Sequence, residues 1–238
     1  YWPLPGHGFA VSLSCLPLFF MHLRNFHSCW MHEGLKPRKS RGTLGFPFTT
    51  VLRFMQLLLK SVDFAARAHR DQRRKGAAQE PYINHPIEVS RLIVECEPHT
   101  GEDILCAAVL HDVIEDCGAT RDEIAACFND IIADIVLEVS DDKALPRDER
   151  KAKQIETAPN LTSGAKLVRL ADKVANVGAM LTDTPVGWDE RQILAYVDWA
   201  EAVIAPCREV SEGLSDRFDA IARDVRIFHQ NELKEAGK

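Results

Sequence analysis

The sequence lacks the cysteine pattern of a disulfide-rich or zinc-binding protein, since no two of its seven cysteines form a CxxC pair. They lie mostly in apolar helical patterns, at Cys15, Cys29, Cys96, Cys106, Cys117, Cys127 and Cys207. An odd set of this kind is typical of reduced thiols in a reducing compartment. We therefore expect no cysteine to bind zinc or to act in catalysis.

Long hydrophobic runs are also scarce. The apolar stretch 9–20 is only twelve residues long and contains Pro17, whereas a membrane-spanning helix needs about 20 residues. No basic residue precedes this stretch, as a secretory signal would require. We expect no membrane association and a cytoplasmic location. The few acids and the run "KPRKSR" near the N-terminus leave an organellar transit peptide open as an alternative.

Basic residues are fewer than acidic residues after residue 54. Residues 1–54 carry six Lys and Arg and one acid, Glu33, which leaves 23 of the 29 cations and 34 of the 35 acids for the remainder. The remainder therefore has a net charge of −11, which argues against sequence-independent binding to a phosphate backbone. We expect no nucleic-acid partner.

The first 54 residues differ from the rest of the chain. They mix Pro, Gly and aromatic residues without a period of 2 or 3.6, and the sequence opens on Tyr1 rather than on Met. We expect residues 1–54 to be an N-terminal extension that is disordered or not native, with Met55 as the functional start. Residues 55–238 are long enough to form one domain with a sizeable core.

From Met55 the apolar residues follow a helical period. The segment "MQLLLKSVDFAARAHRDQRR" predicts an amphipathic helix that ends before Gly76, and "GEDILCAAVLHDVIEDC" predicts a single helix that ends before Gly118. Thr120 and Glu123 have the spacing of a capping box. Later segments continue the pattern, and no Asn-Gly hairpin interrupts them. The sequence predicts an all-α, compact multi-helix domain.

The stretch "AAVLHDVIED", residues 107–116, places an unusual amount of charge on one side of its predicted helix. His111, Asp112, Glu115 and Asp116 form a contiguous arc. The two aspartates are i,i+4 neighbours that repel each other, near a helix C-terminus that already disfavours negative charge. This arrangement favours a bound cation, although a solvated acidic face would give the same pattern.

Two distant residues favour the cation. "PYINHP" supplies His85 immediately before a helix, and "RLADKVAN" supplies Asp172 within another. With His111 and Asp112 they form a set of two imidazoles and two carboxylates. Such nitrogen and oxygen ligation suits a divalent ion such as manganese or iron, and the set has none of the thiolates of structural zinc sites.

The sequence resembles the HD-domain hydrolases of the RelA/SpoT group, most closely the stand-alone metazoan SpoT homologs. The resemblance spans roughly Met55 to Trp199, and the chain is too short for the synthetase domain of the long relatives. It is carried, in order, by "FAARAHRDQRRKG", "PYINHPIEVSRLI", "AAVLHDVIEDC", "EVSDDKALPRDERK", "GAKLVRLADKVAN" and "TPVGW".

The resemblance implies an HD-domain fold with one Mn²⁺ ion. The implied ligands are His85, His111, Asp112 and Asp172. It also implies that Glu115 and Asp116 position and activate the attacking water, since a metal lowers the pKa of bound water and a nearby carboxylate takes the proton. Plain helix-surface charge is the alternative for this pair.

The resemblance further implies a set of substrate contacts, namely Arg74, Lys75, Lys143, Asn176 and Tyr196. A solvated basic helix end is the alternative for the first two, and a core position beside Trp199 is the alternative for Tyr196. We expect His69 to be a buried supporting residue rather than a metal ligand. The basic residues Arg147, Arg150, Lys151 and Lys153 are equally consistent with surface charge. Many relatives have Arg where this chain has Gly178, which puts substrate contacts on that side in doubt.

The implied activity is hydrolysis of guanosine 3′-diphosphate 5′-diphosphate (ppGpp) to GDP and pyrophosphate. The same pocket could instead remove the 2′-phosphate of NADPH. A third hypothesis is a non-catalytic sensing module that keeps the HD fold. The oligomeric state stays open.

Overall fold

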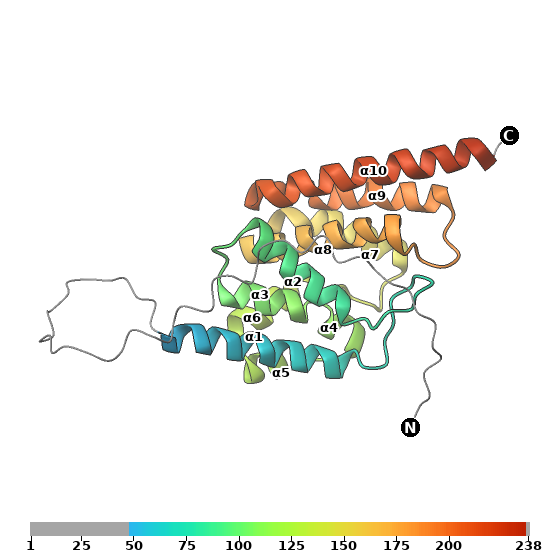
Figure 1. Cartoon of the computed structure of the whole chain (residues 1–238). Helices are drawn as coiled ribbons and strands as arrows, with labels where there is room; N and C mark the ends of the chain where they lie inside the picture. The colour runs from blue at the N-terminus through green and yellow to red at the C-terminus, as the bar shows by residue number, and fades with distance from the viewer. Residues whose placement is uncertain (1–47, 237–238) are drawn as a thin grey trace, which may run out of the picture. The chain divides into compact units, whose positions relative to one another are not determined.

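The computed structural model describes residues 48–236, and all of its regular elements in this range are helical (Figure 1). They are α1 (Phe48–Ala68), α2 (Asn84–Cys96), α3 (Glu102–Leu110), α4 (Val113–Cys117), α5 (Arg121–Cys127), α6 (Asp130–Val139), α7 (Arg147–Thr157), the 3₁₀ helix η1 (Ala158–Asn160), α8 (Ser163–Thr182), α9 (Glu190–Ile204), the 3₁₀ helix η2 (Ala205–Val210) and α10 (Glu212–Ala236). The prediction of an all-α fold is confirmed.

Helix α1 begins seven residues before the predicted start at Met55. Phe54 is partly buried against the hydrophobic core, so the apolar face of the helix extends upstream of Met55. Most of the predicted extension, residues 1–47, lies outside the described residues, and the domain boundary stays a prediction. No helix within residues 48–236 is both long enough and apolar enough to cross a membrane.

The basic run after α1 is not helical, so the predicted continuation of the helix to Gly76 is wrong. Helix α1 ends at Ala68. The His69 ring nitrogen Nδ1 lies 2.7 Å from Oε1 of Gln72, and the amide of Gln72 donates to the carbonyl of His69, which turns the chain. The alternative of a basic helix end is therefore wrong for Arg74.

The predicted single helix over residues 101–118 is also broken. Helix α3 ends at Leu110 and α4 begins at Val113. The ring of His111 donates from Nδ1 to the carbonyl of Ala108 at 2.8 Å, and this carbonyl is the acceptor that the amide of Asp112 would use in a continuous helix. Asp112, at φ −100° and ψ −2°, lies in the bridge region that turns and active sites often use.

Capping at the next two boundaries follows the sequence. Gly118 has φ 74° and ends α4 in the left-handed conformation that glycine adopts without strain. Thr120 then caps α5, and its side chain and that of Glu123 form the predicted capping box. Together they fix where α4, with its acidic residues, ends.

Helix α8 lies at the centre of the domain. It packs against α2, α6, α9 and α10, and most of its residues are buried. In Figure 1, α9 and α10 lie side by side along one edge of the domain, whereas α1 and α5 lie along the opposite edge. A polar residue in the middle of α8 is therefore held rigidly between layers of helices.

Phe218 and Phe228 test this packing on one helix, α10. Phe218 is fully buried, whereas Phe228 is 51% exposed. Deleting a buried Phe side chain removes its transfer free energy and leaves a cavity, so Phe218→Ala should lower the free energy of unfolding by about 3–5 kcal/mol. Phe228→Ala, the matched control, should change it by less than about 1 kcal/mol. Urea denaturation measures both values, and equal losses would contradict the packing.

Candidate active site

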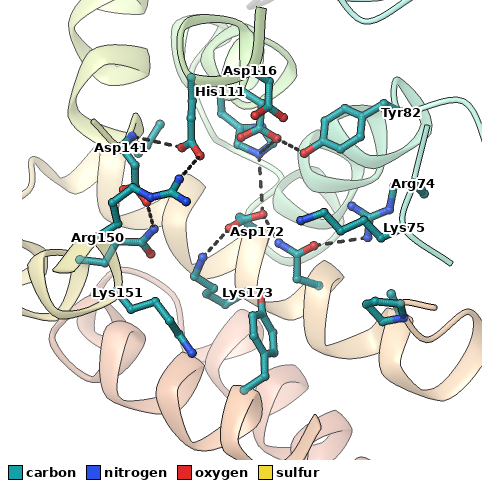
Figure 2. A pocket seen from close by; sticks show the side chains of 18 of the residues that line it. Arg74, Lys75, Tyr82, His111, Asp116, Asp141, Arg150, Lys151, Asp172 and Lys173 are labelled. Atoms are coloured by element: carbon teal, nitrogen blue, oxygen red, sulfur yellow. Dashed lines mark hydrogen bonds and ion pairs between the residues drawn. The ribbon is translucent and has the colours of Figure 1, made fainter. Parts of the chain in front are cut away.

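A cavity of about 480 Å³ opens between α8 and three other parts of the domain. These parts are the segment after α1, the turn between α3 and α4 together with α4, and α7 with the loop before it and the middle of α9. Figure 2 shows Tyr82, Arg74 and Lys75 on one side of this cavity and Arg150 and Lys151 on the other. The cavity therefore gathers segments that are up to 127 residues apart, since Gln72 and Trp199 both line it.

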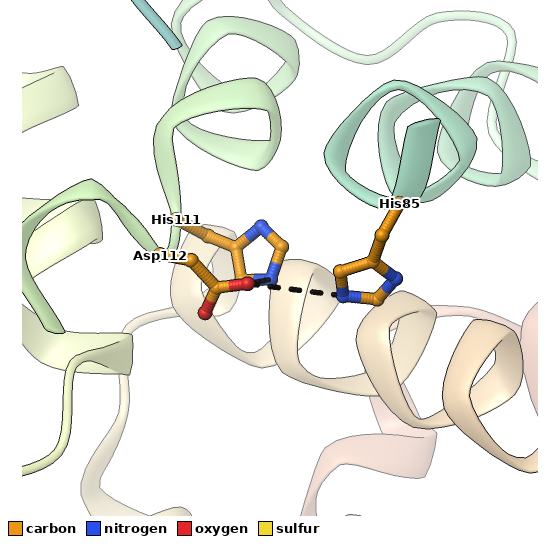
Figure 3. Close-up of side chains that lie close together, drawn as sticks. All are labelled: His85, His111 and Asp112. Atoms are coloured by element: carbon orange, nitrogen blue, oxygen red, sulfur yellow. Dashed lines mark ion pairs between the residues drawn. The ribbon is translucent and has the colours of Figure 1, made fainter. Parts of the chain in front are cut away.

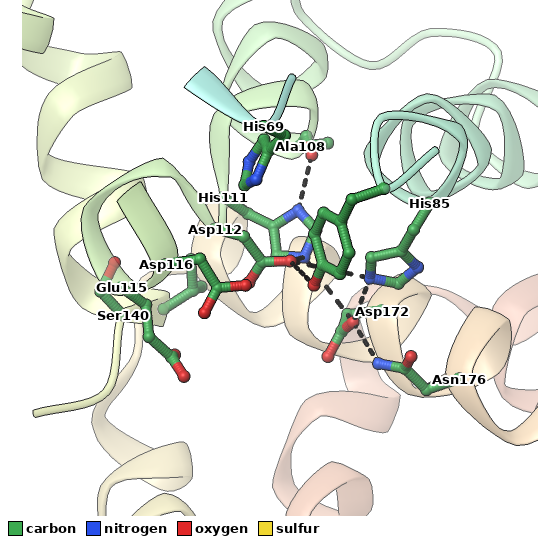
Figure 4. Close-up of polar contacts among 12 residues, drawn as sticks. His69, His85, Ala108, His111, Asp112, Glu115, Asp116, Ser140, Asp172 and Asn176 are labelled. Carbon is green, nitrogen blue, oxygen red and sulfur yellow. Dashed lines mark hydrogen bonds and ion pairs between the residues drawn. The ribbon is translucent and has the colours of Figure 1, made fainter. Parts of the chain in front are cut away.

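Two histidines and two aspartates converge at the inner end of the cavity (Figures 3 and 4). Nε2 of His111 lies 2.9 Å from Oδ2 of Asp112 and 3.7 Å from Oδ1 of Asp172. Nε2 of His85 lies 3.0 Å from Oδ1 of Asp172 and 3.9 Å from Oδ2 of Asp112. The structure thus brings together the four predicted ligands, and three of them place one ligand atom each within 4.8 Å of one another.

The hydrogen bond of the His111 ring decides how this cluster is charged. Because a carbonyl can only accept, Nδ1 carries the proton that is donated to Ala108, and Nε2 of the neutral ring is an unprotonated acceptor. Buried Nε2 has no hydrogen-bond partner among the described residues and faces a carboxylate oxygen of Asp112. Two acceptors that face each other in a buried site are well suited to a cation between them.

The pKa values in the cluster indicate the same preference for positive charge. Burial opposes protonation of His111, but Asp112 and Asp172 outweigh it and raise the pKa of His111 to about 10, so without a metal a proton on Nε2 takes the place of the cation. Burial lowers the pKa of His85. Burial alone would raise the pKa of Asp172, but Lys173 and the two histidines hold it well below its usual range. The residues present therefore fit a divalent cation bound by nitrogen and oxygen ligands.

The acidic pair of α4 lies beside the cluster, on the cavity wall. Oδ2 of Asp116 accepts a hydrogen bond from Nε2 of Gln72 at 2.7 Å, and its other oxygen pairs with Lys143. Oε2 of Glu115 accepts from the amide of Asp141 at 3.1 Å. Burial and the charge of Asp141 raise the pKa of Glu115 to about 6. A carboxyl that titrates near neutral pH in a cavity is a candidate for proton transfer.

The predicted substrate contacts lie around the same cavity. Nη2 of Arg74 donates to Oδ1 of Asn176 at 3.3 Å, and Nδ2 of Asn176 donates to Oδ1 of Asp172 at 2.6 Å. The ring of Tyr196 lies between the rings of Trp188 and Trp199, at centroid distances of 5.5 and 5.2 Å. The cavity is lined by all five predicted contacts, Arg74, Lys75, Lys143, Asn176 and Tyr196.

Helix α7 adds basic residues whose role could not be decided from the sequence. Arg147, Arg150 and Lys151 line the cavity, whereas exposed Lys153 does not. Arg147 lies over the ring of Trp188 at 5.6 Å. The spacing i, i+3, i+4 places the first three on one helix face, and this spacing is the sequence pattern that separates them from Lys153.

His69 and Gly178 lie outside the cluster and the cavity wall. Buried His69 contacts Gln72 and the thiol of Cys117, and it is not part of the cluster. A side chain at Gly178 would point toward Ile221 of α10 rather than into the cavity. The absence of Arg at this position therefore leaves the cavity wall intact.

Comparison with known proteins gives the class of this site. A family model for the HD domain matches residues 61–192. The chain is 44% identical over 165 residues to human guanosine-3′,5′-bis(diphosphate) 3′-pyrophosphohydrolase MESH1, covering 68% of this chain and 92% of that protein. The Xenopus tropicalis protein of the same name is 41% identical over 171 residues, covering 72% and 96%.

A solved structure agrees with these matches. It is that of a metazoan ortholog of SpoT, described as hydrolyzing ppGpp and playing a role in starvation responses. It superimposes with a TM-score of 0.68 at 38% identity, covering 71% of this chain and 94% of the other. The chain therefore belongs to the HD-domain family, and within it to the group of these SpoT homologs. The resemblance noted from the motifs is confirmed.

The raised pKa of Glu115 can be tested on metal-free protein. A ¹³C NMR titration should give the Glu115 carboxyl a pKa of about 6, and Asp141→Asn should lower it because a neighbouring negative charge is removed. Since the folded state binds this proton more tightly than the unfolded chain, Glu115 should cost stability as the pH rises from about 4.5 to about 6. A value near 4.5 in both proteins would contradict the burial of this group.

Proposed function

We propose that this chain is a manganese-dependent hydrolase that converts ppGpp to GDP and pyrophosphate. One observation carries the proposal: His111, Asp112 and Asp172 of the cluster, the acidic pair of α4 and an array of cations line one cavity, and buried His85 lies 3.0 Å from Asp172. The activity is the one for which its relatives are named. We further propose that it acts in the cytoplasm on a free nucleotide.

In this mechanism the cluster residues His85, His111, Asp112 and Asp172 would hold the metal. A divalent cation bound there would supply a Lewis acid and would make water easier to deprotonate. Glu115 and Asp116 orient the attacking water and take its proton as its oxygen bonds to the phosphorus on the 3′ oxygen. The bond from that phosphorus to the 3′ oxygen breaks, so pyrophosphate leaves and the 3′ oxygen gains a proton to give GDP.

The charge around the cavity supports a substrate with phosphates at two places. Arg74 and Lys75 lie on one side, and Arg147 and Lys151 on the other. None of the four pairs with a carboxylate in the described part of the chain, although Arg150 lies 3.6 Å from Oε1 of Glu115. Unpaired cations on both sides of an acidic centre suit a nucleotide whose two phosphate groups extend in different directions.

Aromatic residues near the unpaired cations suit the base. Trp188, two residues before α9, and Tyr196, in the middle of α9, pack edge to face, and both line the cavity. A purine can stack on such rings or on the guanidinium of Arg147. A non-catalytic sensing module would need such contacts but would not need the acidic pair.

The substrate is tested with the purified full chain loaded with Mn²⁺. Wild type should release pyrophosphate from ppGpp, and Asp112→Ala should reduce kcat/KM at least a thousandfold, or about 4 kcal/mol, because a metal ligand is lost. Asp122→Ala removes an aspartate whose side chain is 94% exposed and should leave the rate unchanged. NADPH in the same panel tests the 2′-phosphatase alternative. Metal-loaded wild type that releases nothing from ppGpp would refute the proposal.

The proton-transfer role predicts a pH profile. Because the carboxylate form of Glu115 takes the proton, kcat/KM should rise with pH through the pKa of this carboxyl, which a bound cation shifts below its metal-free value of about 6. Glu115→Gln should lower the rate by about 10²–10⁴-fold and remove this rising limb. Initial rates from pH 5 to 8 measure both effects. An unchanged rising limb in Glu115→Gln would assign the titration to another group.

A further inference from the structure

The carboxylate of Asp112 needs an external support to face the cluster. Asp112 lies in the turn between α3 and α4, at the N-cap position of α4, but its side chain caps no amide there. Its side-chain neighbours at the cluster are the rings of His111 and His85, which themselves face the metal position. Without another contact, an aspartate in a turn could rotate away from the cluster.

Tyr82 supplies that contact. Its hydroxyl donates a hydrogen bond of 2.7 Å to Oδ2 of Asp112, the oxygen that faces both histidines. In the described part of the chain, no other hydrogen bond to the Asp112 side chain is found apart from its ion-pair contacts with the histidines. A tyrosine hydroxyl ordinarily titrates at about pH 10, so Tyr82 is a proton donor across the neutral range.

The other carboxylate of the cluster has supports of the same kind. Oδ2 of Asp172 pairs with Nζ of Lys173 at 2.9 Å, and Oδ1 accepts from Asn176 at 2.6 Å. His111 is held through its bond to Ala108. Partners of this kind orient metal ligands, and losing one typically weakens metal binding by about 10–100-fold. Tyr82 occupies the corresponding place for Asp112.

Tyr82 is itself held in place. Its ring lies 4.9 Å from the ring of His69 and 5.7 Å from that of His85, centroid to centroid. Its amide donates to the carbonyl of Gln72, and its carbonyl accepts from the amide of His85. The guanidinium of Arg74 lies 5.8 Å from the centre of the ring. These contacts fix the ring, so the hydroxyl can hold Asp112 rather than follow it.

We propose that Tyr82 is a positioning residue that sets the affinity for the divalent metal by holding Asp112 in its ligating orientation. The proposal rests on the metal site of the proposed function. The proposal assigns Tyr82 a contact with Asp112 and none with the substrate, so metal binding is the property to measure.

Isothermal titration of metal-free protein with Mn²⁺, without nucleotide, tests the proposal. Tyr82→Phe keeps the ring and its packing but removes the donor, so the Kd for Mn²⁺ should rise about 10–100-fold. Tyr196→Phe is the matched control, because it removes another tyrosine hydroxyl from the same cavity without a hydrogen bond to either aspartate; its Kd should stay within twofold of wild type. A Kd for Tyr82→Phe within twofold of wild type would overturn the proposal.

Thermal melting of the same samples separates positioning from folding. Metal-free Tyr82→Phe should melt within about 2 °C of wild type, while the increase in Tm at a fixed Mn²⁺ concentration should be smaller. A weaker Kd that is matched by the control, or that is accompanied by loss of the folded state, would also overturn the proposal, as would wild type that binds no Mn²⁺.

Pyrophosphate release distinguishes this proposal from the proposed function. Because only metal affinity is lowered, Tyr82→Phe should regain hydrolysis of ppGpp as Mn²⁺ is raised to saturation. If the proposed function is wrong, wild type stays inactive at every Mn²⁺ concentration, whereas the difference in Kd between wild type and Tyr82→Phe persists. If only Tyr82 is misassigned, wild type is active and the two Kd values agree.

Discussion

The site depends on one hydrogen bond, from Nδ1 of His111 to the carbonyl of Ala108. This bond lies at the turn between α3 and α4, where Asp112 has a backbone conformation that an unbroken helix does not supply. It also fixes the tautomer of the neutral ring, so that Nε2 is the nitrogen that takes a metal ion, or a proton in its absence, beside a carboxylate. One side-chain bond therefore links the place of the helix break to the charge of the cluster.

Two layers of cations surround this acidic centre, the inner one paired with its carboxylates and the outer one unpaired within the described residues. The cluster and the acids of α4 are closed in by Lys143, Lys173 and Arg150, each paired with one of these carboxylates. Beyond them lie cations such as Arg74 and Arg147 that pair with no described carboxylate. The inner pairs offset part of the negative charge of the acids, and the outer cations leave their charge free. An acidic protein therefore presents a cationic rim around this one cavity.

Much of this arrangement could be predicted from the sequence, because ordered motifs report which positions converge. His85 and Asp172 were predicted to join the cluster although they are 87 residues apart. The break at His111 was not predicted, because the apolar period runs unbroken through it and the competing bond is made by a side chain. The direction of Arg147 depends on how α7 docks, and Tyr82 has no spacing relation to Asp112. Tertiary packing sets both the direction of Arg147 and the contact between Tyr82 and Asp112.

The segment between α1 and α2 shows why such packing matters for function. Its position is fixed at Gly76, where an added Cβ would lie 1.9 Å from Oδ2 of Asp183, and Asp183 in turn accepts a hydrogen bond from the amide of Ala78. A Cβ at this position would displace the carboxylate of Asp183 and with it the bond to Ala78. Lys75 is also held across the cavity from α7, because the amide of Val186 donates a hydrogen bond of 2.9 Å to its carbonyl. One end of this segment carries Tyr82, which contacts Asp112 of the His and Asp cluster, and the other end carries the cations Arg74 and Lys75. A shift of the segment would therefore change the proposed metal binding and anion binding together.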